Sequence, residues 1–208
     1  MAVDRLRNGP LTAALAGAAL VVALVPAGCG SAAVSRTGSI PAGLVRQSRP
    51  IGTGAAFHPP VSGPVLGPCR RRLGRRVGAH VEVFAADRVV LVAAGIGARP
   101  PLRLSEGRIT GARCFGALVT LEPTGVVLVS PRARLTVSDL FRSWGQRLSS
   151  RGIGTLQARG AARVRVFVGG RAVSAAPGDV PLTRHAEIVL EIGPYVPPHP
   201  AYRFPPGT

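Results

Sequence analysis

The sequence predicts an α+β domain in which a mixed sheet packs on one helix. One segment, residues 135–148, has a strong helical period, with apolar side chains recurring every three or four residues. Segments with the alternating pattern of strands lie on both sides of it. Across residues 117–193 the order is strand, strand, helix, strand, short strand, strand. This order predicts a β-grasp-like mixed sheet, and an additional N-terminal β-hairpin precedes it.

That hairpin is expected from residues 77–85 and 88–92. In its first strand, His80 and Glu82 share the face opposite to the valines. Such a pair is compatible with half of a metal site or of an acid–base site. The alternative is a buried structural histidine whose hydrogen bonds are satisfied within the fold.

The next strand pair is expected at residues 117–121 and 126–129, around ordinary turn chemistry. The helix follows, and Thr136 with Asp139 three positions later predicts a capping box at its start. Gly145 either interrupts the helix or closes it as a left-handed residue.

Beyond the helix we expect a polar loop, a strand, a short return strand and a last strand. Their residues are, in that order, 149–160, 163–168, 171–174 and 187–192. In the last strand, alternation places Ile188 and Leu190 toward the core and Glu187 and Glu191 toward water.

The amino terminus indicates export. Arg5 and Arg7 precede an apolar run at residues 11–25, and small residues then lead to Cys29. Small residues before a cysteine resemble a bacterial lipobox, in which the cysteine is acylated and becomes the first residue of the mature chain. Cleavage after Ala33 would instead release the chain, and an uncleaved segment would remain as an anchor.

These features divide the chain into four parts. They are an export signal of lipoprotein type or an uncleaved anchor (1–28), a disordered tether (29–67), a globular α+β domain (68–195) and a Pro-rich tail (196–208). The tail is expected to be extended and to lie on the domain. We therefore expect a protein at the outer face of the cytoplasmic membrane or in the cell envelope, associated with the membrane through its N-terminus.

The chain has three cysteines. If Cys29 carries lipid, Cys69 and Cys114 remain, and an oxidising compartment favours a disulfide between them. The alternative is two unrelated buried thiols.

The formal net charge is +17, and every basic residue other than histidine is arginine. The one dense basic cluster precedes the first strand and consists of Arg70, Arg71, Arg72, Arg75 and Arg76. It is either a solvated lead-in or a contact for lipid head groups or an anionic envelope polymer. No aromatic residue is interleaved with it, and export argues against a nucleic-acid partner.

From Cys69 onward the chain resembles an uncharacterised family of small exported bacterial proteins of actinobacterial type. The likeness lies in Ala79-His80-Val81, Ala94-Gly95-Ile96-Gly97, Cys114, Thr124-Gly125-Val126-Val127, Phe141-Arg142-Ser143-Trp144-Gly145 and residues 188–193. Many members of that family have His-Thr-His-Asp where this chain has Val119-Thr120-Leu121-Glu122, and a further histidine at the position of Gly78. Since valine and leucine cannot coordinate a metal ion, we expect no metal site. We also expect no other cofactor.

The function expected from these observations is non-catalytic binding of an envelope polymer or a protein partner. No Gly-x-Ser-x-Gly elbow is present, and a Ser–Lys pair is impossible in a chain without lysine. A cysteine nucleophile assisted by His80 would need a free thiol. The alternative is an extracytoplasmic enzyme whose active site has no recognisable motif.

Overall fold

The computed structural model describes residues 49–195 and 202–208. The expected export signal at 1–28, Cys29, the first part of the expected tether and tail residues 196–201 lie outside the described residues. In the part of the chain that is described, no helix combines the length and the apolar character needed to cross a membrane.

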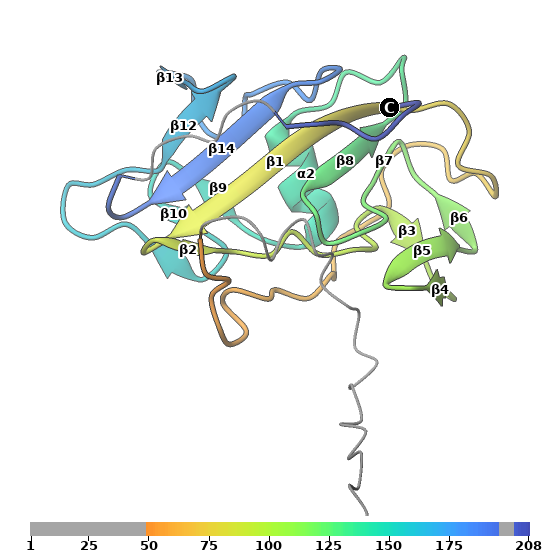
Figure 1. The fold of residues 1–208 in the computed structure, drawn as a ribbon, viewed down its shortest axis with the longest axis horizontal. Coiled ribbons are helices and arrows are strands. Elements are labelled where there is room, and N and C mark those ends of the chain that lie inside the picture. Colours follow the sequence, from red (N-terminus) through yellow and green to blue (C-terminus); the bar gives the residue numbers. More distant parts are fainter. Residues whose placement is uncertain (1–48, 196–201) are drawn as a thin grey trace, which may run out of the picture. The chain divides into compact units, whose positions relative to one another are not determined.

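A seven-stranded mixed sheet is the centre of the fold (Figure 1). Its strands are β1 (Val77–Ala85), β2 (Arg88–Val89), β7 (Leu118–Val119), β8 (Val126–Val129), β12 (Arg165–Val168), β13 (Arg171–Val173) and β14 (Glu187–Ile192). They follow the order β13-β12-β14-β1-β8-β7, and β2 pairs with the end of β1. β1 and β14 run parallel, with His80 opposite Glu187, and the other pairs in this sheet are antiparallel.

Parallel pairing of the first and last long strands at the centre of the sheet is the β-grasp arrangement. The expected class, a β-grasp-like mixed sheet packed on one helix, is confirmed. The N-terminal hairpin has a different place from the one expected, because its long strand β1 is central and its partner β2 has two residues. β1 is buried along nearly its whole length, as a central strand covered on both faces must be. Residues 117–121 contribute only the edge strand β7.

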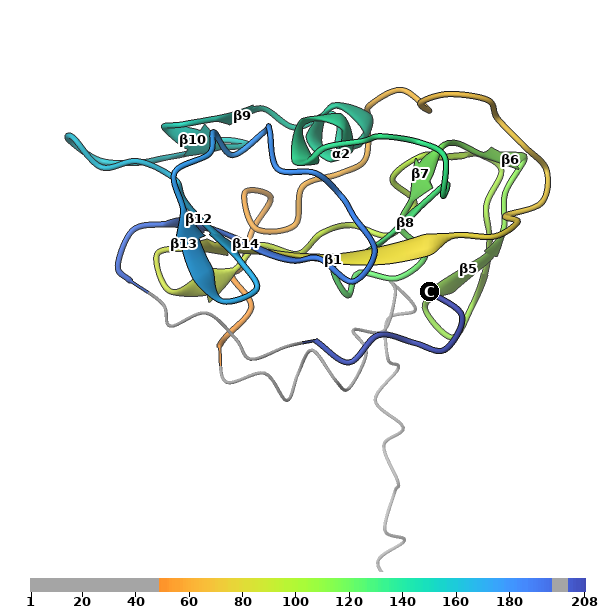
Figure 2. The same ribbon diagram turned by 90° about the horizontal axis from the view of Figure 1, so that it is seen from above.

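The helix α2 (Val137–Trp144) lies on one face of the sheet, and its apolar stripe forms the middle of the core (Figure 2). At its start, Asp139 accepts a hydrogen bond from the backbone N–H of Thr136 at 3.0 Å. At its end, Gly145 adopts a left-handed conformation with φ of 82°. The expected capping interaction is confirmed, and Gly145 closes the helix.

Smaller sheets occupy the connections. Between β2 and β7 lie β3 (Ala98–Arg99), β4 (Arg103–Ser105), β5 (Arg108–Gly111) and β6 (Cys114–Phe115), paired as β3-β6 and β4-β5. After the helix come β9 (Leu148–Ser149), β10 (Gly152–Ile153) and β11 (Leu156–Gln157), which form a three-stranded sheet. The prediction of one polar loop at 149–160 was therefore wrong. Its polar backbone groups pair with one another, while Ile153 and Ala158 anchor it in the core.

The folded part begins earlier than expected, because residues 49–67 lie against the domain rather than forming the end of a tether. The indole N–H of Trp144 donates to the carbonyl of Pro59 at 3.2 Å, and the hydroxyl of Ser143 donates to the carbonyl of Pro64 at 2.9 Å. This segment thus covers part of the helix surface that would be exposed to solvent if the fold consisted of the sheet and the helix alone. Proline carbonyls suit this role since they accept hydrogen bonds without offering a donor in return.

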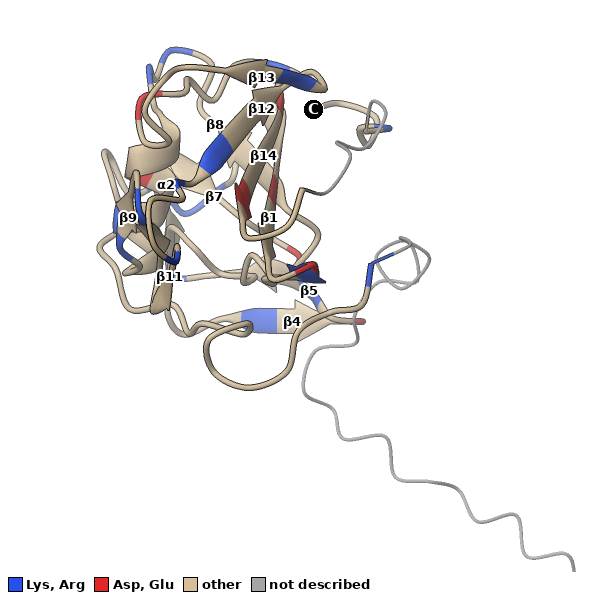
Figure 3. Ribbon diagram, turned by 90° about the vertical axis from the view of Figure 1, so that its left-hand side faces the viewer, with Lys and Arg blue, Asp and Glu red and all other residues tan. Residues whose placement is uncertain are grey.

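The opposite face of the sheet is also covered, which corrects the expected exposure of Glu187 and Glu191. Figure 3 shows the acidic segments of β1 and β14 beside one another within the sheet. Glu191 has an exposed fraction of 0% and forms an ion pair with Arg165 at 3.0 Å. Glu187 is buried and accepts a hydrogen bond from the backbone N–H of Tyr202 at 2.9 Å. Tail residues 202–208 lie on this face, in agreement with the expectation that the tail lies on the domain.

Candidate anion-binding pocket

The disulfide predicted between Cys69 and Cys114 is present, with 5.3 Å between the two α-carbons. It ties the basic lead-in to β6. The next residues, Arg70 and Phe115, exchange two backbone hydrogen bonds of 2.9 and 2.8 Å. The basic lead-in is therefore part of the folded domain, and the disulfide and these two hydrogen bonds fix the position of its first residues.

The five clustered arginines divide into one buried and four exposed residues. Arg70, Arg71, Arg72 and Arg75 are exposed, whereas Arg76 has an exposed fraction of 8%. The interpretation as a solvated lead-in thus does not hold for Arg76. Only Arg76, the residue directly before β1, is turned inward.

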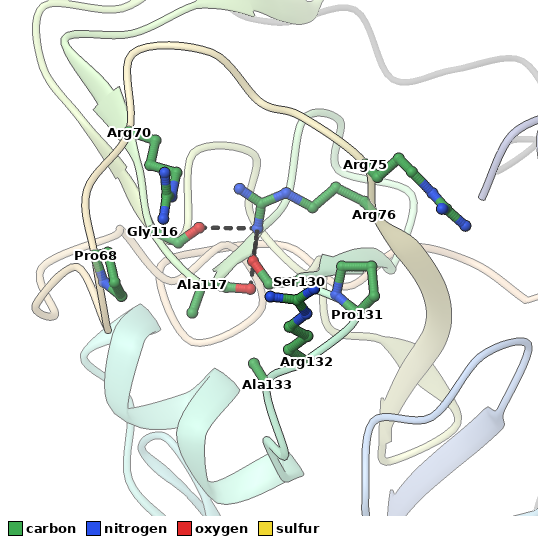
Figure 4. Close-up of a pocket in the computed structure, with 10 residues that line it drawn as sticks. All are labelled: Pro68, Arg70, Arg75, Arg76, Gly116, Ala117, Ser130, Pro131, Arg132 and Ala133. Atoms are coloured by element: carbon green, nitrogen blue, oxygen red, sulfur yellow. Dashed lines mark hydrogen bonds between the residues drawn. The ribbon is translucent and has the colours of Figure 1, made fainter.

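The guanidinium of Arg76 is held by four hydrogen bonds to uncharged acceptors. Its Nε donates to the Leu73 carbonyl at 2.8 Å. Its Nη1 donates to the carbonyls of Gly116 and Ala117 and to the hydroxyl of Ser130 at 2.8, 3.0 and 3.0 Å. Nη2 is the remaining nitrogen, and Figure 4 shows it on the side of the group that faces Arg70.

This guanidinium forms one wall of a pocket of about 540 Å³, which we call pocket A (Figure 4). The pocket is lined by Pro68, Arg70, Arg75, Arg76, Gly116, Ala117, Ser130, Pro131, Arg132 and Ala133. Arg70 and Arg132 line the same pocket and lie, in this view, on two sides of the Arg76 guanidinium, and Arg75 extends outward at the rim. Arg132 was not singled out from the sequence, because one arginine in a loop carries no signal in a chain this rich in arginine.

The pocket is strongly positive. Among the residues that the structure describes, no Asp or Glu lines it, and no carboxylate within the described ranges forms an ion pair with Arg76. Burial, with a smaller contribution from the charge of Arg70, lowers the pKa of Arg76 below its usual value. Arginine nevertheless stays protonated in proteins, so a desolvated charge remains at the pocket wall. An oxyanion bound there would pair with the buried charge of Arg76 and would offset its repulsion by Arg70.

His80 takes a structural position. It has an exposed fraction of 1%, its Nε2 lies 3.0 Å from the Thr124 carbonyl, and Tyr202 stacks on its ring at 3.7 Å. Its Nδ1 is 4.0 Å from Glu82. In the described ranges, no group of three or more His, Cys, Asp or Glu is arranged to hold a metal ion. The contacts of His80 support the structural interpretation.

Comparison of the chain with protein-family models, with curated proteins and with solved structures gave no match. The fold and the chemistry of pocket A are therefore the basis of the proposed function, and the family resemblance stays a prediction.

Proposed function

We propose that this protein is an exported, membrane-tethered envelope protein whose folded domain is a non-catalytic binding module for an anionic ligand. The observation that carries this proposal is the buried guanidinium of Arg76. Four hydrogen bonds fix its direction, and the residues described around it supply no neutralising carboxylate.

A fixed guanidinium favours oxyanions for two reasons. Charge-assisted hydrogen bonds are about twice as strong as neutral ones, and the planar group matches phosphate or carboxylate oxygens. Arg76 is already ordered, so little conformational entropy is lost when a ligand binds. Arg70 and Arg132 supply further donors from the two sides of the pocket.

The binding proposal is tested with inorganic phosphate and the full chain in a non-ionic detergent. Amide chemical shifts of Gly116, Ala117 and Ser130 report on pocket A, and they should change saturably. In Arg70→Gln/Arg132→Gln, the affinity should fall by about tenfold or more, the equivalent of one lost charge-assisted hydrogen bond.

A charge-matched control is Arg159→Gln/Arg184→Gln, since both residues are exposed and neither lines pocket A. It should bind phosphate as the wild type does. Equal losses of phosphate affinity in both double variants would show that binding depends on net charge and not on pocket A. No saturable shift at all would refute the binding function.

The tether has its own test, because Cys29 lies outside the described residues. Wild type and Cys29→Ala are expressed in a host that acylates lipoproteins and are then partitioned between detergent and water. The wild type should enter the detergent phase and the variant should not. Equal partitioning of the two would refute lipid attachment.

A further inference from the structure

A second pocket of about 490 Å³, which we call pocket B, is also rich in arginine. It is lined by Arg71, Arg72, Leu73, Arg103, Arg108, Ile109, Thr110, Gly111, Phe115 and Leu121. Arg108 forms an ion pair with Glu122. For Arg71, Arg72 and Arg103, no carboxylate of the described residues is within ion-pair distance, and no described Asp or Glu lines the pocket.

Pockets A and B share one wall. Arg70 lines pocket A and its neighbour Arg71 lines pocket B, while Phe115 lines pocket B and its neighbour Gly116 lines pocket A. Arg70 and Phe115 are themselves a hydrogen-bonded pair of antiparallel residues. The two pockets are therefore neighbours that border the same two chain segments, residues 70–71 and 115–116, which we call the ridge, and the Cys69–Cys114 bond lies at one end of this ridge.

We propose that pockets A and B are successive subsites for one extended polyanion, a polymer with repeated phosphate or carboxylate groups that crosses this ridge. This inference rests on the proposed function and specifies its ligand. A single small oxyanion would neutralise one pocket and leave the other charged. A linked second anionic group enters its subsite at high effective concentration, which raises affinity without any new contact.

The lining also indicates what the polymer lacks. Pocket A has no aromatic residue among the described ones that line it, and pocket B has only Phe115, which is buried. A nucleic-acid strand gains much of its affinity from bases stacked on exposed aromatic rings. The two pockets offer mainly guanidinium groups and aliphatic side chains instead, and these suit a polymer of charged groups on an aliphatic or inorganic backbone.

The test is isothermal titration calorimetry of the full chain with tripolyphosphate and with long-chain polyphosphate. Three variants each remove two charges: Arg70→Gln/Arg132→Gln in pocket A, Arg71→Gln/Arg72→Gln in pocket B, and Arg159→Gln/Arg184→Gln as the control. Tripolyphosphate should bind at two sites in the wild type and at one site in each pocket variant. Long-chain polyphosphate should lose affinity by about tenfold or more in either pocket variant and keep it in the control.

The outcomes separate this inference from the proposed function. If the pocket B variant binds the long chain as the wild type does, the two-subsite inference is overturned and binding at pocket A stands. If neither probe binds, both fail. Polyglutamate binding with the same dependence on both pockets would extend the ligand class to carboxylate polymers. Tighter binding of an oligothymidylate of equal charge would overturn the assignment to a polymer without rings.

Discussion

Removal of the Cys69–Cys114 disulfide should lower the free energy of unfolding by about 4 kcal/mol. The cysteines are 45 residues apart, and a loop of that length gives this value in the chain-entropy model. The loop contains all of β1 and the strands from β2 to β5, so the bond restrains the central strand as well as the side sheets. Domains of ordinary stability have only about 5–15 kcal/mol in total.

The perturbation is Cys69→Ser/Cys114→Ser in a Cys29→Ser background, so that no thiol remains to exchange. Urea unfolding is followed by fluorescence of Trp144, the only tryptophan of the chain and a fully buried one. The midpoint should fall and the slope should rise, because an uncrosslinked chain exposes more surface when it unfolds. A loss under about 1 kcal/mol would refute the reasoning, since the error of the extrapolation is of that order.

Three further predictions concern single contacts. Gly125→Ala should destabilise the domain by about 1–3 kcal/mol in a thermal melt, because φ is 80° there and the new Cβ would lie 2.5 Å from the Val81 carbonyl oxygen. Gly54→Ala has a similar φ with open space around the Cβ position, and an equal loss there would assign the effect to φ alone. Arg165→Met should lower the free energy of unfolding in urea by about 1–3 kcal/mol, since it removes the ion pair to the buried Glu191. Recovery of stability in Arg165→Met/Glu191→Gln would support this cause. An unchanged unfolding midpoint in the single variant would contradict it. Burial, followed by the charge of Glu122, raises the pKa of Tyr202. Docking of the neutral ring should therefore stabilise the tail, and this stabilisation should be complete below the ordinary tyrosine pKa of about 10. It should be lost as the pH rises through the higher pKa of the folded state. Tyrosinate absorbance should show this late titration in the wild type and lose it in Tyr202→Phe. A wild-type curve with no titration above the ordinary tyrosine pKa of about 10 would show that the Tyr202 ring is not buried.

Several parts of the molecule were predictable from local chemistry. The period of residues 137–144 and the pairing of Thr136 with Asp139 specify a capped amphipathic helix, and both depend on neighbours in sequence. Alternation specified the long strands β1, β12 and β14, and Gly169 and Gly170, both with positive φ, form the tight turn between β12 and β13. The cysteine pairing was favoured by counting on the assumption that Cys29 carries lipid in an oxidising compartment, and the structure excludes the alternative of two unrelated thiols.

The place of β1 was not predictable, because strand pairing is set by contacts between segments that are far apart in the chain. Periodicity shows that residues 77–85 form a strand, but their parallel pairing with β14 joins residues more than a hundred positions apart. The burial of Glu187 and Glu191 has the same origin. Alternation assigned them to the second face of the sheet correctly, and contacts with distant residues, among them tail residue Tyr202 and the side chain of Arg165, bury them there.

By itself, the sequence determined the fold class, the helix with its N-terminal capping box, and the presence of a basic lead-in, since each depends on residue type and short spacing, and it favoured the disulfide. Only the tertiary structure decided which arginines act together. Arg76 becomes a buried donor because the carbonyls of Gly116 and Ala117, some forty residues later, are brought to it by the disulfide-linked ridge. Arg132 joins it from a third segment. A pocket is lined by residues that are close in space, and the spacing of those residues along the chain does not show which distant segments the fold brings together.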